Sequence, residues 1–337
     1  MGDKQRFQFS QAFTDFYFNA NIEKLDGLAE GRRMFIVIDQ KVAEHHSAFV
    51  DRFDCIILPS GEHHKVQATV DAIVLKLLER GADRRSLLVG VGGGVVTDLT
   101  GYVAAIYMRG ISFGFVPTTL LAMVDAAIGG KNGIDVGMYK NMVGTIRQPE
   151  FILYDYRVLA SLSLADWQNG FAEIIKHASI KDNKMFALLE QRAVEHYRRN
   201  HEDLATLVRD NALIKIMTVQ ADEFEKGDRK LLNFGHTLGH AIENEYQLSH
   251  GQAIAIGMNF ASALSERKTP FGERLRVKKL LEHYGLPTEM VFDKEMVLSI
   301  MKRDKKSEGA FINFVLLDHI GKASVYPITF DEIFENI

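Results

Sequence analysis

The chain has 337 residues, of which 47% are hydrophobic and 25% are charged, as in an ordinary globular protein large enough for two domains. The formal net charge of −4 excludes a strongly basic surface, so we expect neither nucleic acid nor an anionic membrane as a partner. The single cysteine, Cys55, excludes an intramolecular disulfide, and because the chain shows neither a membrane-length apolar run nor a signal peptide, we expect a cytoplasmic protein.

The first half of the chain alternates short apolar segments with amphipathic stretches. The segments predicted as strands are 34–38, 55–59, 86–91, 111–116 and 151–155, and the spacing of apolar residues predicts a helix over 66–80. Short apolar strands separated by helices are typical of βαβ units with a parallel sheet. We therefore expect an α/β domain over residues 1–158.

The second half has no proline between Pro149 and Pro270. Because proline breaks helices, this span permits long ones. Apolar residues at three-to-four spacing predict helices over 165–180, 203–220, 253–267 and 271–285, and residues 311–317 and 322–327 predict a small hairpin. We therefore expect a helical domain over residues 159–337.

A triple glycine, Gly92-Gly93-Gly94, lies between a predicted strand and a predicted helix. Glycines at such a turn let the backbone approach a phosphate closely, and the start of a helix favours an anion. The dinucleotide fingerprint is not met, because Thr97 stands where a third glycine is required, and the Walker motif is absent from the sequence. The segment is thus either a ligand-binding turn or only a tight strand-to-helix connection.

Three of the 12 histidines, His236, His240 and His250, lie close together in sequence. Neutral imidazole is a preferred ligand of zinc and similar divalent metals. His236 and His240 are four residues apart and share one face of a helix, which makes them the first candidates for a ligand pair. The alternative is a polar helix whose histidines form local hydrogen bonds.

Glu173 lies in an otherwise apolar helical stretch, GFAEIIKHA, where an unpaired carboxylate is costly. It either forms an ion pair with Lys176 or supplies the acidic ligand of a metal site that the histidines complete.

Four basic residues lie beside glycine or in apolar surroundings, namely Arg109, Lys131, Lys140 and Arg229. Taken singly, each of these residues is expected to be a solvated surface side chain. Their convergence would instead predict a site for a phosphate or a carboxylate.

Six sequence blocks, in this order and spacing, resemble the 3-dehydroquinate synthase family, which belongs to the sugar phosphate cyclases. The blocks are GGGVVTDLTGYVAAIYMRG, VPTTLLAMVDAAIGGKNGID, KNMVG, GFAEIIKHA, LNFGHTLGHAIE and HGQAIAIGM. The resemblance extends from about residue 34 to about residue 317. Six blocks in register are far more specific than any one of them.

The resemblance implies a Rossmann-like NAD-binding α/β domain, an all-α metal- and substrate-binding domain, and a site in the cleft between them. The family converts the sugar phosphate 3-deoxy-D-arabino-heptulosonate 7-phosphate to 3-dehydroquinate and phosphate, in the shikimate pathway of aromatic amino-acid biosynthesis. It uses tightly held NAD and a divalent metal, usually Zn²⁺ and alternatively Co²⁺. NAD is regenerated in every turnover, because the alcohol that is oxidised is later reduced again.

Carried over by position, the resemblance implies that Glu173, His236 and His250 hold the metal. His240 would instead be a proton-transfer group near the phosphate, which replaces the ligand pair expected from spacing. The substrate-contacting positions are Asp125, Lys131, Lys176, Lys215, Arg229 and Asn233, and those at the phosphate end are Arg109, Lys140 and Asn141. The NAD-contacting positions are Asp39, Glu62, Lys65, Gly93, Gly94, Asp98, Thr118, Thr119, Lys140 and Ser161.

Three positions carry a further expectation from the resemblance. In the family Arg109 often reaches the site from a second subunit, which implies a homodimer. Lys306 matches a lysine near the substrate carboxylate, and the adjacent Lys305 leaves that register open. Asp98 either contacts NAD or is a helix-start acid favoured by the helix dipole.

Several positions depart from the family's usual pattern, namely Ala126, Ala127, Asn132, Tyr139, Ser161 and Ser163. They leave open a related cyclase of the 2-epi-5-epi-valiolone or 2-deoxy-scyllo-inosose synthase type. Lys215, Arg229 and Lys306 argue against such a cyclase, because they suit a carboxylate substrate. The sequence also leaves open a metal- and NAD-dependent polyol dehydrogenase and a catalytically inactive binding module.

Overall fold

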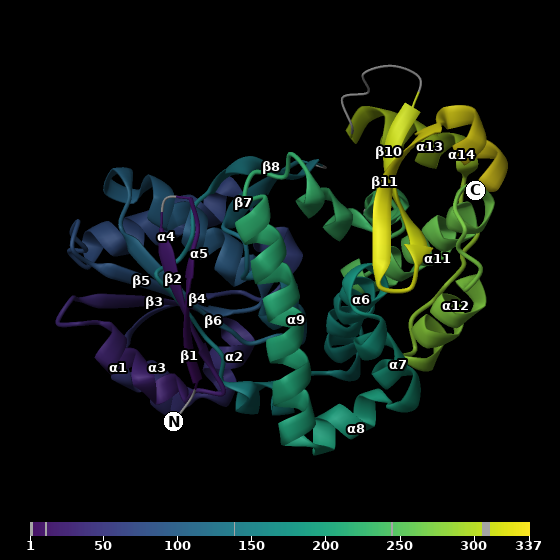
Figure 1. The fold of residues 1–337 in the computed structure, drawn as a ribbon. Coiled ribbons are helices and arrows are strands. Elements are labelled where there is room, and N and C mark those ends of the chain that lie inside the picture. Colours follow the sequence, from purple (N-terminus) through teal and green to yellow (C-terminus); the bar gives the residue numbers. More distant parts are fainter. Residues whose placement is uncertain (1–2, 11, 138, 244, 305–310) are drawn as a thin grey trace. The chain divides into compact units, whose positions relative to one another are not determined.

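The computed structural model describes residues 3–10, 12–137, 139–243, 245–304 and 311–337. The chain divides into two compact units, residues 1–163 with 201–223 and residues 164–200 with 224–337 (Figure 1). The long helix α9 (His201–Ala221) is therefore part of the first unit, although it follows the first helices of the second unit in sequence. The domain boundary expected after residue 158 stays a prediction.

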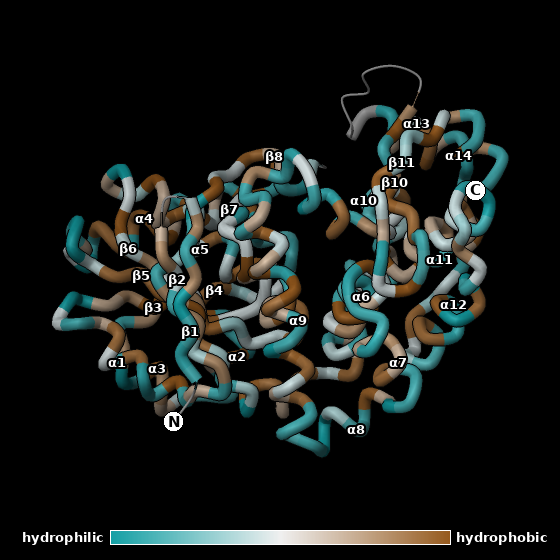
Figure 2. Tube along the Cα trace, in the orientation of Figure 1, coloured by the Kyte–Doolittle hydropathy of each residue, from teal (hydrophilic) through white to brown (hydrophobic). Residues whose placement is uncertain are grey.

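A seven-stranded sheet forms the centre of the first unit, in the order β1-β2-β9-β6-β5-β3-β4. The strands are β1 (Asp3–Gln8), β2 (Phe13–Phe18), β3 (Met34–Asp39), β4 (Asp54–Leu58), β5 (Leu87–Gly92), β6 (Ser112–Pro117) and β9 (Phe151–Leu153). Neighbours are parallel except for the edge strand β1, which is antiparallel to β2. β3, β5 and β6 are almost wholly buried, as their continuous apolar sequences predict, and Figure 2 shows their hydrophobic character. The predicted parallel α/β sheet is confirmed.

Helices connect the parallel strands. α2 (Gln40–His45) and α3 (Ser47–Arg52) connect β3 to β4, α4 (Gln67–Glu79) connects β4 to β5, and α5 (Gly94–Ile106) connects β5 to β6. From β3 the chain moves to β4 on one side and then returns past β3 to β5, so the direction of strand order reverses between β3 and β5. In open parallel sheets a ligand binds at such a point, outside the carboxyl ends of the strands.

A separate hairpin, β7 (Lys131–Val136) and β8 (Tyr139–Ile146), packs through β7 against α5. This hairpin has no signal in the sequence pattern, because β8 is largely exposed and lacks the apolar run that marks a buried strand. The first unit also contains short helical segments: η1 (Ile22–Lys24), α1 (Leu25–Leu28), η2 (Glu62–His64), η3 (Tyr107–Arg109), the π-helical turn η4 (Ala122–Ala126) and η5 (Tyr156–Ser161). The helix α9 packs against η4 and η5.

The second unit is mainly helical. Its helices are α6 (Leu164–Lys181), α7 (Asn183–Gln191), α8 (Val194–Arg199), η6 (Asp228–Asn233), α10 (His236–Glu243), α11 (His250–Lys268), α12 (Arg274–His283), α13 (Lys294–Asp304) and α14 (Phe330–Asn336). The predicted antiparallel hairpin is present as β10 (Phe311–His319) and β11 (Lys322–Thr329). A buried apolar cluster that includes Ile242, Ile256 and Leu316 joins α10, α11 and this hairpin. Over the described residues, none of the helices has both the length and the hydropathy that crossing a membrane requires.

Candidate metal centre and cofactor site

Three side chains of the second unit form a cluster of metal-ligand type. Glu173, His236 and His250 each offer one ligand atom, and these atoms lie within 4.8 Å of one another. The Nε2 atoms of His250 and His236 are 2.9 Å and 3.6 Å from the same oxygen of Glu173, Oε1. The cluster contains His250 and not His240, which is the set implied by the resemblance rather than the pair suggested by spacing.

These distances suit a small divalent cation. Ligand atoms about 2.0–2.2 Å from a tetrahedral zinc ion lie roughly 3.3 Å from one another, and the two observed distances, 2.9 Å and 3.6 Å, bracket that value. Two imidazole nitrogens and one carboxylate also leave a fourth position for water or substrate, as in catalytic zinc sites. The residues therefore fit the metal that the family uses.

The helix α10 packs against α11, and His236 and His250 are the first residues of these two helices. A Cβ on Gly257 of α11 would overlap the carbonyl oxygen of Gly235, which directly precedes His236. Gly235 itself has φ +80°, a conformation that favours glycine. The two glycines, Gly235 and Gly257, thus allow the backbone before His236 to lie directly against α11.

Glu173 combines both roles that the sequence leaves open. It is fully buried in the middle of α6, and its Oε2 forms an ion pair with Lys176, one turn further along the helix and 2% exposed at its side chain. Its other oxygen, Oε1, faces the two histidines. One carboxylate therefore pairs with a lysine through one oxygen and presents the other to the two histidines.

The two histidines have opposite electrostatic surroundings. Burial, with the nearby Lys176 ammonium, holds the pKa of His236 well below its usual value, which favours the neutral imidazole that binds metals. Burial alone would also lower the pKa of His250, but Glu173 and Glu243 outweigh it and raise this pKa to about 9. Nδ1 of His236 lies 3.1 Å from the carbonyl oxygen of Phe234, and because a carbonyl only accepts, this nitrogen donates and the lone pair lies on Nε2.

Other predicted residues of the second unit surround this cluster or lie near it in sequence. His240 is exposed, and its ring centroid is 5.0 Å from that of His236 and 6.4 Å from that of His250. Arg229 is buried in η6, and Asn233 at the end of η6 donates to Glu225 over 2.6 Å. Lys306 and its neighbour Lys305 lie outside the described residues.

Several of the predicted NAD residues lie at the carboxyl ends of the parallel strands. Asp39 ends β3, Gly93 follows β5, and Thr118 follows β6. A Cβ on Gly93 would lie 3.1 Å from the side chain of Thr119, and a Cβ on Gly94 would lie 3.2 Å from that of Ala126. Glycine at these two positions therefore lets the start of α5 lie close to Thr119, after β6, and to Ala126 of η4.

Two of the carboxylates near this edge already have partners in the chain. Asp39 caps α2, accepting from the backbone N–H of Lys41 at 2.9 Å and from the hydroxyl of Ser60 at 2.7 Å, both on Oδ1. Asp98 pairs with Lys65 at 2.6 Å, and the Lys65 ammonium also donates to Asn141 Oδ1 at 2.5 Å. Asn141, which is predicted to contact phosphate, therefore lies beside Lys65 and Asp98, which are predicted to contact NAD.

Burial sets the direction of the pKa shift for Asp98, whereas neighbouring carboxylates set it for Lys65. Desolvation raises the pKa of Asp98 to about 6, although Lys65 acts in the opposite direction. Burial also disfavours charged Lys65, but Asp98 and Glu62 outweigh it, so that its pKa is raised. Lys65 is thus a permanent cation whose side chain is only 6% exposed.

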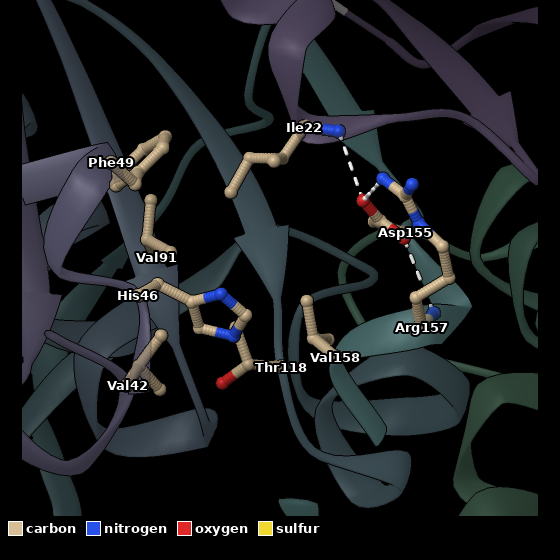
Figure 3. Close-up of a pocket in the computed structure, with 9 residues that line it drawn as sticks. All are labelled: Ile22, Val42, His46, Phe49, Val91, Thr118, Asp155, Arg157 and Val158. Atoms are coloured by element: carbon tan, nitrogen blue, oxygen red, sulfur yellow. Dashed lines mark hydrogen bonds and ion pairs between the residues drawn. The ribbon is translucent and has the colours of Figure 1, made fainter. Parts of the chain in front are cut away.

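A cavity of about 310 Å³ opens at the same edge of the sheet (Figure 3). Val42, His46 and Phe49 line one side, and the ion-paired Asp155 and Arg157 line the other. The remaining lining residues are Ile22, Val91, Thr118 and Val158. An apolar cavity with a few polar groups at its rim is typical of a small-molecule site, and its place in the sheet fits part of a dinucleotide.

The other predicted residues of the first unit lie on several elements. Lys215 of α9 pairs with Asp125 of the π-helical turn η4 at 2.7 Å. Lys131 begins β7, and Lys140 and Asn141 are the second and third residues of β8. Arg109 is exposed at the end of η3, and Glu62 and Ser161 are also exposed. The convergence of Arg109, Lys131 and Lys140 on one anion stays a prediction.

The departure at Asn132 has a structural explanation. This side chain is buried, and its amide donates to the carbonyl oxygens of Gly130 at 2.7 Å and Arg147 at 3.0 Å. It fills the space above Gly101 of α5, where a Cβ would overlap its Oδ1. Asn132 therefore closes the base of the hairpin against α5.

Glu243 is a site residue that the sequence analysis missed. It is buried at the end of α10, and its Oε2 lies 3.5 Å from Nδ1 of His250. The signal was present, because Glu243 follows His236 by seven residues, two helical turns, and so shares its face.

Known families and curated relatives match most of this chain. The N-terminal 3-dehydroquinate synthase model matches residues 55–169, and the C-terminal model matches residues 170–307. The chain is 39% identical to the 3-dehydroquinate synthase of Campylobacter curvus over 318 residues, 91% of each chain. It is 43% identical to that of Thermococcus kodakarensis over 276 residues, 81% of this chain and 77% of the relative.

Solved structures show the same fold. The 2-epi-5-epi-valiolone synthase of Streptomyces hygroscopicus, with NAD⁺ and Zn²⁺ bound, is 27% identical with a TM-score of 0.85, over 98% of this chain and 97% of that one. A 2-deoxy-scyllo-inosose synthase in complex with carbaglucose-6-phosphate, NAD⁺ and Co²⁺ has a TM-score of 0.86 at 24% identity, over 99% of this chain and 98% of that one. On the two family-model matches and the identity to curated relatives over most of its length, this chain belongs to the 3-dehydroquinate synthase family.

Proposed function

We propose that this chain catalyses the reaction of its family, the conversion of 3-deoxy-D-arabino-heptulosonate 7-phosphate to 3-dehydroquinate and phosphate. Its cofactors are NAD and a divalent metal, which makes it a phosphate-eliminating carbon–oxygen lyase of the shikimate pathway. The observation that carries the proposal is the cluster of Glu173, His236 and His250 in a chain about 40% identical to 3-dehydroquinate synthases. The three side chains are the donors of a catalytic metal site, and the rest of the sequence is that of the family.

The residues of the second unit hold and surround the metal in this proposal. When bound, the metal would supply a Lewis acid for the substrate hydroxyl, and NAD would supply the acceptor for the hydride of that carbon. Glu173, His236 and His250 hold the cation, while the Lys176 ammonium offsets part of the Glu173 charge. His240, exposed beside the two histidines, transfers a proton near the phosphate, and Arg229 binds the substrate carboxylate.

The residues of the first unit bind NAD and the phosphate in this proposal. Gly93, Gly94, Thr118 and Thr119 receive the dinucleotide at the start of α5, and the cavity beside Thr118 receives part of it. Asp39, Glu62, Lys65, Asp98 and Ser161 complete the NAD site. Lys140 and Asn141 bind phosphate together with Arg109, and Asp125, Lys131 and Lys215, with Lys176 and Asn233 of the second unit, contact the sugar.

We propose that the chain acts as a homodimer in the cytoplasm. Arg109 follows Met108, and the two have φ +67° and +48°, a strained conformation for residues other than glycine. Strain of this kind is retained where a side chain must be held in one direction, which supports delivery of exposed Arg109 to a partner's site. The single cysteine, Cys55, is consistent with a reducing compartment.

A second candidate is another sugar phosphate cyclase, which the TM-score of 0.85 to 2-epi-5-epi-valiolone synthase favours. The two candidates differ in substrate and not in cofactors. The buried arginine Arg229 and the buried lysine Lys215 suit the carboxylate of the heptulosonate substrate better than a neutral sugar.

The deciding experiment measures phosphate release by the purified chain while the absorbance of NADH is followed. With NAD and Zn²⁺ present, we expect phosphate release from 3-deoxy-D-arabino-heptulosonate 7-phosphate without accumulation of NADH. Sedoheptulose 7-phosphate and glucose 6-phosphate are the competing substrates, and turnover of either in place of the heptulosonate would move the function to another cyclase. Stoichiometric NADH formation would instead indicate a dehydrogenase.

A further inference from the structure

We propose that Glu243 is a positioning residue of the metal centre, which orients the imidazole of His250 by accepting a hydrogen bond from Nδ1–H and so presents Nε2 to the metal. This inference rests on the proposed function only in that it takes Glu173, His236 and His250 as the metal ligands. It assigns a role to a residue outside that ligand set.

The geometry places His250 between two carboxylates. Its Nε2 is 2.9 Å from Glu173 Oε1, and its Nδ1 is 3.5 Å from Glu243 Oε2. The two nitrogens of an imidazole point in nearly opposite directions, so a carboxylate on Nδ1 defines where Nε2 points. The side chain of Glu243 is 8% exposed, which leaves little water to compete for the Nδ1 proton.

The same helix supplies a ligand at one end and the positioning residue at the other. α10 begins with His236 and ends with Glu243, two turns later on the same face. The position of His250 is fixed independently, because a capping box between Ser249 and Gln252 begins α11 at that residue. Glu243 is therefore aligned with the ring of His250 by the packing of α10 against α11.

The two histidine ligands are oriented by different chemistry. His236 has the neutral carbonyl oxygen of Phe234 at its Nδ1, and His250 has the Glu243 carboxylate. A carboxylate partner makes the imidazole a more basic ligand than a carbonyl does, and the loss of such a partner typically lowers metal affinity about 10- to 100-fold. Within the described residues, Glu173 and Glu243 are the carboxylates that contact His250, and Glu173 is engaged at the ligand nitrogen.

The test compares Glu243→Ala, Glu243→Gln and the control Glu245→Gln, which removes the same charge from an exposed position two residues away. Zn²⁺ affinity is measured by chelator competition on the full chain, without substrate or NAD. We expect Glu243→Ala to weaken binding about 10- to 100-fold and Glu243→Gln less, because an amide oxygen still accepts from Nδ1. The control should bind as tightly as the unaltered chain.

A second readout separates positioning from a general structural role. In ¹⁵N spectra of the Zn²⁺-loaded chain, His250 should show a coordinated Nε2 and a protonated Nδ1, and Glu243→Ala should shift or broaden the Nδ1 signal while that of His236 is kept. Equal Zn²⁺ affinity in the chain and in both Glu243 variants would overturn the inference. So would an affinity loss with an unchanged Nδ1 signal, or Zn²⁺ coordination through Nδ1. Since no turnover is measured, failure of the proposed reaction would leave this result intact.

Discussion

Lys176 lies one helical turn after Glu173, and its ammonium pairs with Oε2 of that carboxylate, while Oε1 faces the imidazoles of His236 and His250. The pair is buried inside the second unit. A buried carboxylate is stable only when its charge is compensated, and Lys176 supplies that compensation before any metal is bound. The site is thus prepared for a cation without being unstable in its absence.

Glu173→Gln keeps the size of the side chain and removes its charge. We expect Zn²⁺ affinity to fall by more than about 100-fold, beyond the usual effect of a partner outside the ligand set. Metal content after dialysis, measured by mass spectrometry, checks this, with Glu195→Gln on the exposed face of α8 as control. Unchanged metal content in both Glu173→Gln and His236→Ala would place the metal elsewhere.

Lys176→Met should make stability depend on the metal. Without its partner, the buried Glu173 carboxylate loses compensation, which typically costs about 3–5 kcal/mol in the free energy of unfolding. Bound Zn²⁺ replaces part of that positive charge, so the loss should be smaller in the loaded chain. Urea unfolding with Zn²⁺ and with a chelator measures both, and Lys181→Met, exposed at the end of the same helix, should change neither. Equal losses with and without metal would contradict the account.

Gly257→Ala should displace His236. The added methyl overlaps the carbonyl oxygen of Gly235, which is backbone and moves only if α10 and α11 separate. We expect lower thermal stability and weaker Zn²⁺ binding together. Gly272→Ala is the matched control, because a Cβ there meets nothing within 4 Å. Normal metal binding in Gly257→Ala would show that the helix contact does not position the ligand.

Gly101→Ala and Asn132→Ala should not be additive. Gly101→Ala forces the Asn132 amide away from the carbonyl oxygens of Gly130 and Arg147. Asn132→Ala removes the same two hydrogen bonds. Each substitution leaves buried acceptors unpaired, which lowers the free energy of unfolding by about 1–3 kcal/mol. In the double variant the new methyl occupies space that Asn132 has left. We expect the double variant to be at least about 1 kcal/mol more stable than the sum of the single effects predicts. Strictly additive effects would show that the two residues are not energetically coupled.

Asp98 should give a pH-dependent contribution to stability. Its pKa is raised from 3.8 in an unfolded chain to about 6 by burial, so its protonated form favours the fold. The contribution is present below pH 4 and is lost as the pH rises through about 6, by at most about 3 kcal/mol. Lys65 stays charged across this range, because its pKa is raised above 10.5. Urea unfolding between pH 4 and 7 should show this decline in the unaltered chain and not in Asp98→Asn, whereas parallel profiles would contradict it.

The sequence by itself predicts those strands and helices whose burial leaves a regular pattern of apolar residues. β3, β5 and β6 are buried on both faces, so their continuous apolar runs identify them, and the long helices α6, α9 and α11 are marked by apolar periodicity. The motif order around Glu173, His236 and His250 identifies the family, because several blocks in register are specific even when each block alone is ambiguous.

Only the tertiary structure decides which residues meet. The strands β1 and β8 carry no apolar run, since all their residues are exposed or half-buried, and their partners β2 and β7 are buried only in part. The choice of His250 over His240, the shared use of Glu173 by Lys176 and the histidines, and the approach of Glu243 to His250 all depend on how α6, α10 and α11 pack. Spacing along one helix predicts which residues share a face. Contacts between helices depend instead on how closely the backbones approach, which Gly235 and Gly257 allow for α10 and α11.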